Sequence, residues 1–222
     1  MTDTIISQNY IGSVIKQCMD DDMDEDSEDD SMDDSNLVFG ITTALNLTTR
    51  KENECIQQLR AIILERAQKS AKDATLKLIR NILGNDGSPV GFVINERFIN
   101  IPAQISVPML SNLVGEIKRA NDKKMPYNFS YYLMILKFHR KEAKKGKPAE
   151  DLYANPEEEL FANEALDSFD YSVADEADTG FSGNWLEDDE VLTPYRKFII
   201  IDGKKLPDIV DNITSYINNT TV

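Results

Sequence analysis

YNFSYYLMILKF, residues 127–138, is the most strand-like stretch of this 222-residue chain. Aromatic and branched side chains dominate it, as is typical of a pleated, half-buried backbone, and it is long enough for a central strand. Residues 38–47, VFGITTALNL, are apolar at nearly every position, which indicates a strand covered on both faces. Shorter strand patterns cover residues 11–17, 89–98, 169–173 and 195–201. These segments predict one sheet of about six strands.

Helical patterns occupy most of the sequence between these strands. Residues 49–52, TRKE, form a capping-box pattern ahead of apolar residues at helical spacing. Pro102 opens a second amphipathic pattern, in which Pro108 predicts a kink or a late start. Further helical patterns cover residues 74–83, 155–166 and 203–217. The order of elements predicts a single α/β or α+β domain, residues 1–222, with a mostly antiparallel or mixed sheet flanked by helices.

Charge is separated into blocks along the chain, whose formal net charge is −15. Residues 20–34 hold eleven acids and no base, and residues 150–190 hold fifteen acids and no base. Residues 118–147 carry ten Lys or Arg against two acids. Because like charges repel and few apolar side chains accompany them, we expect residues 20–34 to form a disordered loop. We expect residues 140–150 to form a solvated basic loop.

The same charges exclude several classes of protein. A strongly acidic chain is a poor general ligand for nucleic acid, whose phosphates are bound mainly by Lys and Arg. The cations of residues 118–147 alternate with aromatics, a pattern that also suits stacking on single-stranded nucleic acid, but a buried strand followed by a basic loop is the simpler interpretation. Short basic runs of this kind also serve as nuclear import signals. No stretch approaches the roughly 18 apolar residues of a membrane span, so we expect an intracellular protein without a membrane partner.

Catalytic and metal-binding patterns are scarce. His139 is the one histidine, and it stands among cations that disfavour its protonated form. Neither a Gly-x-x-x-x-Gly-Lys-Ser/Thr loop nor a Gly-x-Gly-x-x-Gly fingerprint occurs, and the acids of 20–34 lack EF-hand spacing. We therefore expect no enzyme activity, no metal and no cofactor.

Several literal runs resemble one family. Glu96-Arg97-Phe98-Ile99-Asn100-Ile101-Pro102 with Gln104-Ile105 and Val107-Pro108-Met109 resembles the ERFIN(V/L)PPQ-plus-PM stretch of the BCCIP family. Residues 10–17, YIGSVIKQ, and 169–173, FDYSV, are similar to that family as well. Its members are eukaryotic nuclear proteins named for binding a breast-cancer-susceptibility protein and a cyclin-dependent-kinase inhibitor.

The resemblance implies an α/β sheet distantly similar to the GNAT acetyltransferases, without their activity. The Gly-x-Gly that such enzymes use to hold the acetyl-CoA pyrophosphate occurs nowhere in the 222 residues. A residual acyltransferase is the least favoured alternative. Family members usually carry a further N-terminal segment before the part that resembles residues 11–17, so we expect a sheet edge to be left uncovered here.

The resemblance also implies escort and adaptor work. Fungal relatives act as a chaperone for a ribosomal protein of the large subunit and assist nuclear export, whereas animal relatives are linked to DNA repair and cell-cycle control. The leading hypothesis is a non-enzymatic nuclear chaperone or adaptor, able to shuttle to the cytoplasm, that binds a basic client through the acids of 20–34 and 150–190. The alternative is a regulator of DNA repair and the cell cycle that binds nuclear regulatory proteins through a groove on the folded domain.

The candidate functional residues lie in the acidic block 20–34 and around Trp185. The candidate partner-binding residues are Asp20, Asp21, Asp22, Asp24, Glu25, Asp26, Glu28, Asp29, Asp30, Phe181 and Trp185, and the candidate phosphorylation sites are Ser27 and Ser31. The family motif, residues 96–102, is either a recognition surface or a strand-to-helix junction. The junction is favoured, because Phe98, Ile99 and Ile101 are core-type side chains and Asn100 with Pro102 suits a helix start.

Overall fold

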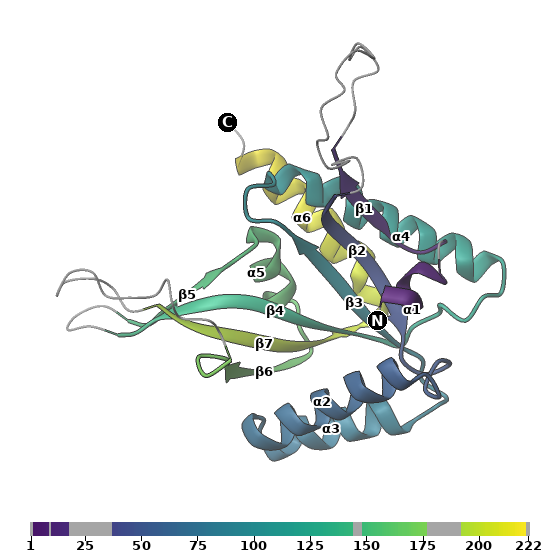
Figure 1. The fold of residues 1–222 in the computed structure, drawn as a ribbon, viewed down its shortest axis with the longest axis horizontal. Helices are drawn as coiled ribbons and strands as arrows, with labels where there is room; N and C mark the ends of the chain where they lie inside the picture. The colour runs from purple at the N-terminus through teal and green to yellow at the C-terminus, as the bar shows by residue number, and fades with distance from the viewer. Residues whose placement is uncertain (1, 9, 18–36, 144–147, 177–191, 221–222) are drawn as a thin grey trace, which may run out of the picture.

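One mixed sheet organises the chain (Figure 1). The computed structural model describes residues 2–8, 10–17, 37–143, 148–176 and 192–220. Its strands are β1 (Ser13–Lys16), β2 (Val38–Asn46), β3 (Val90–Arg97), β4 (Tyr131–Lys141), β5 (Glu150–Tyr153), β6 (Asp167–Ser172) and β7 (Leu192–Asp202). Their order is β1-β2-β3-β4-β7-β6, and β5 pairs with β4 beside this path. The expected mixed sheet flanked by helices is confirmed; β5 is the strand that the sequence patterns did not predict.

β4 lies at the centre of the sheet, as expected, but it begins and ends later in the sequence than expected. It begins at Tyr131 rather than at residue 127 and continues through Lys141, because it pairs with β7 along its whole length. Tyr127 and Phe129 are buried in the segment that leads into the strand. The expected basic loop of residues 140–150 is therefore wrong at both ends, since its first two residues belong to β4 and Glu150 begins β5.

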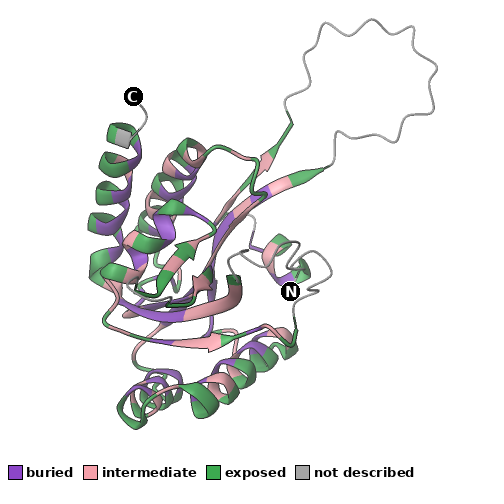
Figure 2. Cartoon of the chain, turned by 90° about the vertical axis from the view of Figure 1, so that its left-hand side faces the viewer, coloured by how far each residue is buried: buried purple, intermediate pink, exposed green. Residues whose placement is uncertain are grey.

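Helices cover both faces of the sheet and bury two apolar cores (Figure 2). They are α1 (Thr2–Ile6), α2 (Glu54–Ser70), α3 (Asp73–Gly84), α4 (Ser106–Asp122), α5 (Pro156–Asn163) and α6 (Leu206–Thr220). α2 and α3 pack on one face around Leu45, Ile63 and Phe198. α4, α5 and α6 pack on the other face around Leu110, Phe161 and Ile213. Among the described residues, no helix is long and apolar enough to span a membrane.

The start of α2 differs from the capping-box prediction. The side chain of Asn46 accepts the backbone N–H groups of Thr48 and Thr49, at 2.9 Å each, so the chain turns before it becomes helical. The helix begins after Asn53, whose Oδ1 accepts the N–H of Cys55 at 3.0 Å. An Asn side chain accepts from the unpaired N–H groups of the first helical turn as a Thr side chain would. Because the chain turns after Asn46, the cap is Asn53 and not Thr49.

The family motif joins β3 to α4. The expected late helix start is confirmed, because a 3₁₀ turn (Ala103–Ile105) follows Pro102 and α4 begins at Ser106. The expectation that Phe98 and Ile99 are core residues is wrong: their exposed fractions are 57% and 91%. They follow the last residue of β3, and the ring of Phe98 meets that of Phe39 on β2 edge-on, with 5.9 Å between the centroids.

Candidate functional site

The parallel strands β3 and β4 diverge toward their carboxyl ends. They pair only over residues 90–92 and 131–133. Farther along, the same side of β4 pairs with β5 through residues 138–141. Because crevices at the carboxyl ends of strands are the usual ligand sites of α/β sheets, this divergence marks a candidate site.

The beginning of α5 fills this crevice. Glu157 is fully buried, and its carboxylate accepts from Arg97 Nη2 at 3.1 Å and from Asn95 Nδ2 at 3.2 Å, both on β3. Glu158, also buried, accepts from the backbone N–H of Lys137 on β4 and from Asn155 Nδ2, at 2.8 Å each. Two neighbouring carboxylates of the chain therefore join the strands on either side of the crevice.

The carboxyl group of Glu158 has an altered acidity. Burial raises its pKa to about 7, and the charges of Glu96 and Glu157 act in the same direction, whereas its hydrogen bonds oppose the shift. Both hydrogen bonds stabilise the ionised form, and they therefore limit the rise in pKa that burial causes.

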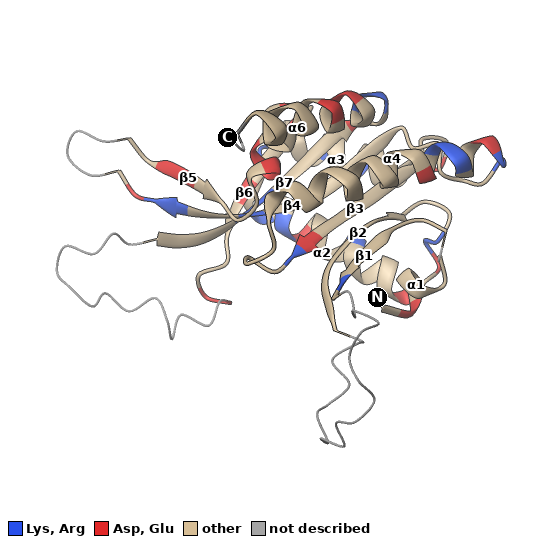
Figure 3. Cartoon of the chain, turned by 90° about the horizontal axis from the view of Figure 1, so that it is seen from above, with Lys and Arg blue, Asp and Glu red and all other residues tan. Residues whose placement is uncertain are grey.

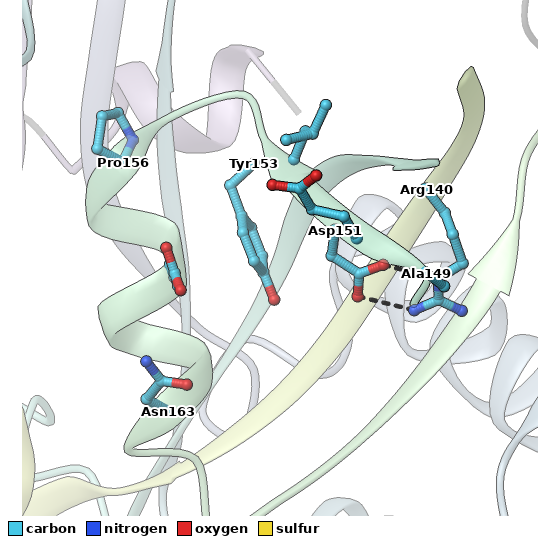
Figure 4. A pocket seen from close by; sticks show the side chains of 9 residues that line it. Arg140, Ala149, Asp151, Tyr153, Pro156 and Asn163 are labelled. Atoms are coloured by element: carbon cyan, nitrogen blue, oxygen red, sulfur yellow. Dashed lines mark hydrogen bonds and ion pairs between the residues drawn. The ribbon is translucent and has the colours of Figure 1, made fainter. Parts of the chain in front are cut away.

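An open groove of about 880 Å³ lies between β5 and α5 (Figure 4). Its walls are residues 149–153 and Arg140 on the strand side, and Pro156, Glu159 and Asn163 on the helix side. Figure 4 shows the ring of Tyr153 between the strand and the helix. The size is in the range of small-ligand and peptide sites.

Arg140 fixes the strand side of this groove. Its Nε and Nη2 donate to the two carboxylate oxygens of Asp151 at 2.7 and 2.8 Å, and Nη2 also donates to Asp170 at 2.8 Å. The guanidinium lies 5.1 Å from the ring centroid of Phe138 and 4.7 Å from that of Tyr195. A planar, bidentate and stacked arginine of this kind holds its neighbours in one geometry, so β5 is firmly attached to β4.

The remaining charges of the groove are negative. Glu150 and Glu159 are exposed, and within the described part of the chain neither carboxylate has an ion-pair partner. Burial, with the charges of Asp151 and Asp170, raises the pKa of Tyr153 to about 12, so its hydroxyl stays protonated. Carboxylates beside an aromatic ring suit a Lys or Arg side chain, and Figure 3 shows acids on β5 next to the basic end of β4.

A smaller cavity of about 390 Å³ lies on the opposite side of the sheet. Its lining residues are Ile62, Arg66, Tyr171, Val173, Glu176 and Arg196. Arg66 donates to Glu176 at 2.6 Å and lies 5.3 Å from the ring centroid of Tyr171. Glu176 thus offsets the charge of Arg66, and Arg196 remains as a second cation in the lining.

Several acids of the second acidic block, residues 150–190, form ion pairs within the chain. Its ion-paired members are Asp151 and Asp170 with Arg140, Asp170 with Lys197, Glu157 with Arg97, Glu164 with Lys205 and Glu176 with Arg66. These acids are thus paired within the chain, and the contact of this block with a client stays a prediction. Among the described acids of the block, Glu150, Glu159, Asp167 and Asp175 have no ion-pair partner, and Glu150 and Glu159 are the two that line the groove.

The other candidate residues lie outside the part of the chain that the structure describes. This holds for residues 20–34, with Ser27 and Ser31, and for Phe181 and Trp185. The groove residues Leu152 and Tyr153 were missed, because four residues are too few for a clear period. One signal could have predicted the strand: Glu150 and Lys141 have opposite charges and lie opposite each other in the register of β5 and β4.

Comparisons with known proteins agree with this architecture. The sequence profile of the BCCIP family matches residues 1–161. A Drosophila melanogaster protein named "Protein BCCIP homolog" is 52% identical over 218 residues, which cover 98% of this chain and 73% of that protein. The chain belongs to the BCCIP family. The resemblance read from residues 96–102 is thereby confirmed.

The chain is also similar to a human protein in sequence and to a yeast protein in structure. The human protein named "BRCA2 and CDKN1A-interacting protein" is 37% identical over 236 residues, covering 98% of this chain and 71% of its own length. The crystal structure of BCP1 from Saccharomyces cerevisiae superposes with a TM-score of 0.53 at 14% identity, over 82% of this chain and 67% of that one. The match to the yeast structure shows a similar fold and nothing further.

Proposed function

We propose that the protein is a non-enzymatic nuclear chaperone or adaptor that binds a basic client, such as a ribosomal protein of the large subunit. The observation that carries this proposal is the open groove between β5 and α5, where the charged groups without an ion-pair partner among the described residues, Glu150 and Glu159, are carboxylates. The base-free acidic block of residues 20–34 adds a second source of negative charge. In this role the protein supports ribosome biogenesis or nuclear export, and it moves between nucleus and cytoplasm.

An acidic escort suits a basic client for an electrostatic reason. Free ribosomal proteins bind RNA through the same cations that carboxylates would cover, so an escort competes with RNA until delivery. Opposite charges attract at long range, so such contacts form quickly, and salt weakens them by screening.

The absence of catalysis is part of the proposal. The crevice at the carboxyl ends of β3 and β4 is filled by Glu157 and Glu158. Within the described residues, no group of three His, Cys, Asp or Glu side chains could hold a metal ion. A fold related to enzymes can serve as a binding scaffold, because function depends on the site and not on the fold.

The alternative function is regulation of DNA repair and the cell cycle through protein binding. It is favoured by the name of the human relative, which refers to BRCA2 and CDKN1A. In this alternative the partner binds in the groove and not to residues 20–34, which act as a spacer.

Replacing the eleven acids of residues 20–34 by Ser and Asn separates the two functions. With purified large-subunit ribosomal proteins as ligands, the chaperone proposal expects weaker binding and a shallower salt dependence, measured by calorimetry between low and moderate salt. Unchanged binding of those proteins at low salt would remove the block from the mechanism. Undiminished binding of the purified human BRCA2 and CDKN1A proteins by the same variant would favour the regulator. Calorimetry with acetyl-CoA tests the non-enzymatic assignment, and measurable binding would contradict it.

A further inference from the structure

The groove between β5 and α5 follows the backbone of an edge strand. Five consecutive residues, 149–153, line it, so one wall is the strand's own main chain. Among the described strands, β5 pairs only with β4, and its second edge faces the groove. An edge of this kind offers unpaired N–H and C=O groups that a further strand can use.

The strand pairing identifies which backbone groups face the groove. The N–H of Ala154 donates to the carbonyl of Lys137 at 2.9 Å, so residue 154 is bonded inward, to β4. In an antiparallel pair inward and outward residues alternate. Leu152 and Glu150 are therefore bonded inward, whereas the N–H and C=O of Tyr153 and Asp151 point to the free edge.

The charge of the groove selects the class of partner. Glu159 faces the strand from α5, and Glu150 lies at its beginning, while the carboxylate of Asp151 is already paired with Arg140. A segment with Lys or Arg side chains would neutralise the two free carboxylates and could place a cation over the ring of Tyr153. Nucleic acid would bring its phosphates toward those carboxylates and is disfavoured.

We propose that the free edge of β5 receives an extended, Lys- or Arg-containing segment of a partner protein as an additional strand of the sheet. Main-chain hydrogen bonds to Asp151 and Tyr153 provide the affinity, and Glu150 and Glu159 provide the preference for basic side chains. A segment of about four residues spans β5 at roughly 3.3 Å per residue. The inference rests on the proposed function, because it names the site at which a basic partner docks.

The test uses the full 222-residue chain and a blocked eight-residue peptide of alternating Lys and Thr. NMR-detected hydrogen exchange should slow by about ten-fold or more at the amides of Asp151 and Tyr153 when peptide is bound, as expected for newly bonded amides. Exchange at Leu152 and Glu150, which are already bonded to β4, should change little. Two versions of this peptide, N-methylated at one or the other set of alternate residues, should differ: the version that has lost the N–H groups facing β5 should bind more weakly. A Glu-Thr peptide should not bind.

Charge variants complete the test. Glu150→Gln with Glu159→Gln should weaken peptide binding about five- to ten-fold at low salt, since rim charges mainly set attraction. Glu52→Gln with Asp211→Asn removes the same charge at exposed positions away from the groove and should leave binding nearly unchanged. Equal loss in both double variants would show non-specific attraction and would overturn the site.

Other outcomes also count against the inference without touching the proposed function. Peptide binding with unchanged exchange at Asp151 and Tyr153 would exclude strand addition. Binding that survives the groove variants but is lost when the acids of 20–34 are replaced would move the contact to that block. If large-subunit ribosomal proteins bind the chain while the peptide does not, the inference fails and the proposed function stands.

Discussion

Arg97 and Glu157 form a buried ion pair that joins the end of β3 to the first turn of α5, although 60 positions separate them in the sequence. The carboxylate has no exposed side-chain area, and Arg97 retains only 6%. Together with Glu158 and Lys137, this pair closes the crevice between the parallel strands and positions α5 as one wall of the groove.

Breaking this pair should destabilise the protein strongly. Glu157→Ala leaves the Arg97 guanidinium buried without its partner, and we expect a loss of about 3–5 kcal/mol in the free energy of unfolding. The double variant Arg97→Met with Glu157→Leu should lose less, because apolar side chains of similar volume need no charge partner. Urea denaturation at pH 7 measures both, and a single-variant loss below about 1 kcal/mol would contradict the role given to the pair.

Glu158 should make stability depend on pH. Its pKa rises from an ordinary value of 4.5 to about 7 in the folded state, so the folded chain holds a proton that the unfolded chain releases. Stability contributed by this group is therefore complete below about pH 4.5 and is lost as the pH rises toward 7. Because one pKa unit corresponds to 1.36 kcal/mol, the loss is on the order of 3 kcal/mol.

Glu158→Gln isolates this effect, because other groups titrate in the same range. The difference in unfolding free energy between wild type and variant should fall between pH 4.5 and pH 7 and level off above it. Chemical denaturation at several pH values provides the curve, and a flat difference would refute the assignment.

Arg140 should not tolerate lysine. Arg140→Lys keeps the charge but loses the paired hydrogen bonds to Asp151 and the stacking on Tyr195, and we expect a loss of about 1–3 kcal/mol. Hydrogen exchange of the inward amides of β5 should accelerate as the strand loosens. Arg66→Lys, at the more exposed pair with Glu176, is the matched control and should change stability by less than about 1 kcal/mol.

Ile99 should contribute little to stability. It is 91% exposed, so Ile99→Ser should change the free energy of unfolding by no more than about 0.5 kcal/mol. Ile199→Ser is the matched control: Ile199 is fully buried, and we expect a loss above about 3 kcal/mol. Thermal unfolding of the two variants distinguishes them, and a large effect at Ile99 would mean that the motif is packed in solution.

The sequence by itself determined the fold class and most elements. The apolar stretches 38–47 and 127–138 contain strands because their side chains favour a pleated, covered backbone, and the helical patterns at 74–83 and after Pro102 follow from apolar periodicity. The literal runs around residues 96–102 identified the family, and its sequence profile confirms it.

Tertiary structure alone decided the site. β5 has four residues and becomes a strand only because β4 extends beyond its expected end to pair with it. Glu157 and Glu158 lie in the first turn of α5, and nothing in their local sequence shows that both are buried, with Arg97 and the Lys137 amide as their partners. Local patterns indicate which residues favour a strand or a helix; which carboxylates are bonded inward and which remain free in the groove depends on distant partners that only the folded chain brings together.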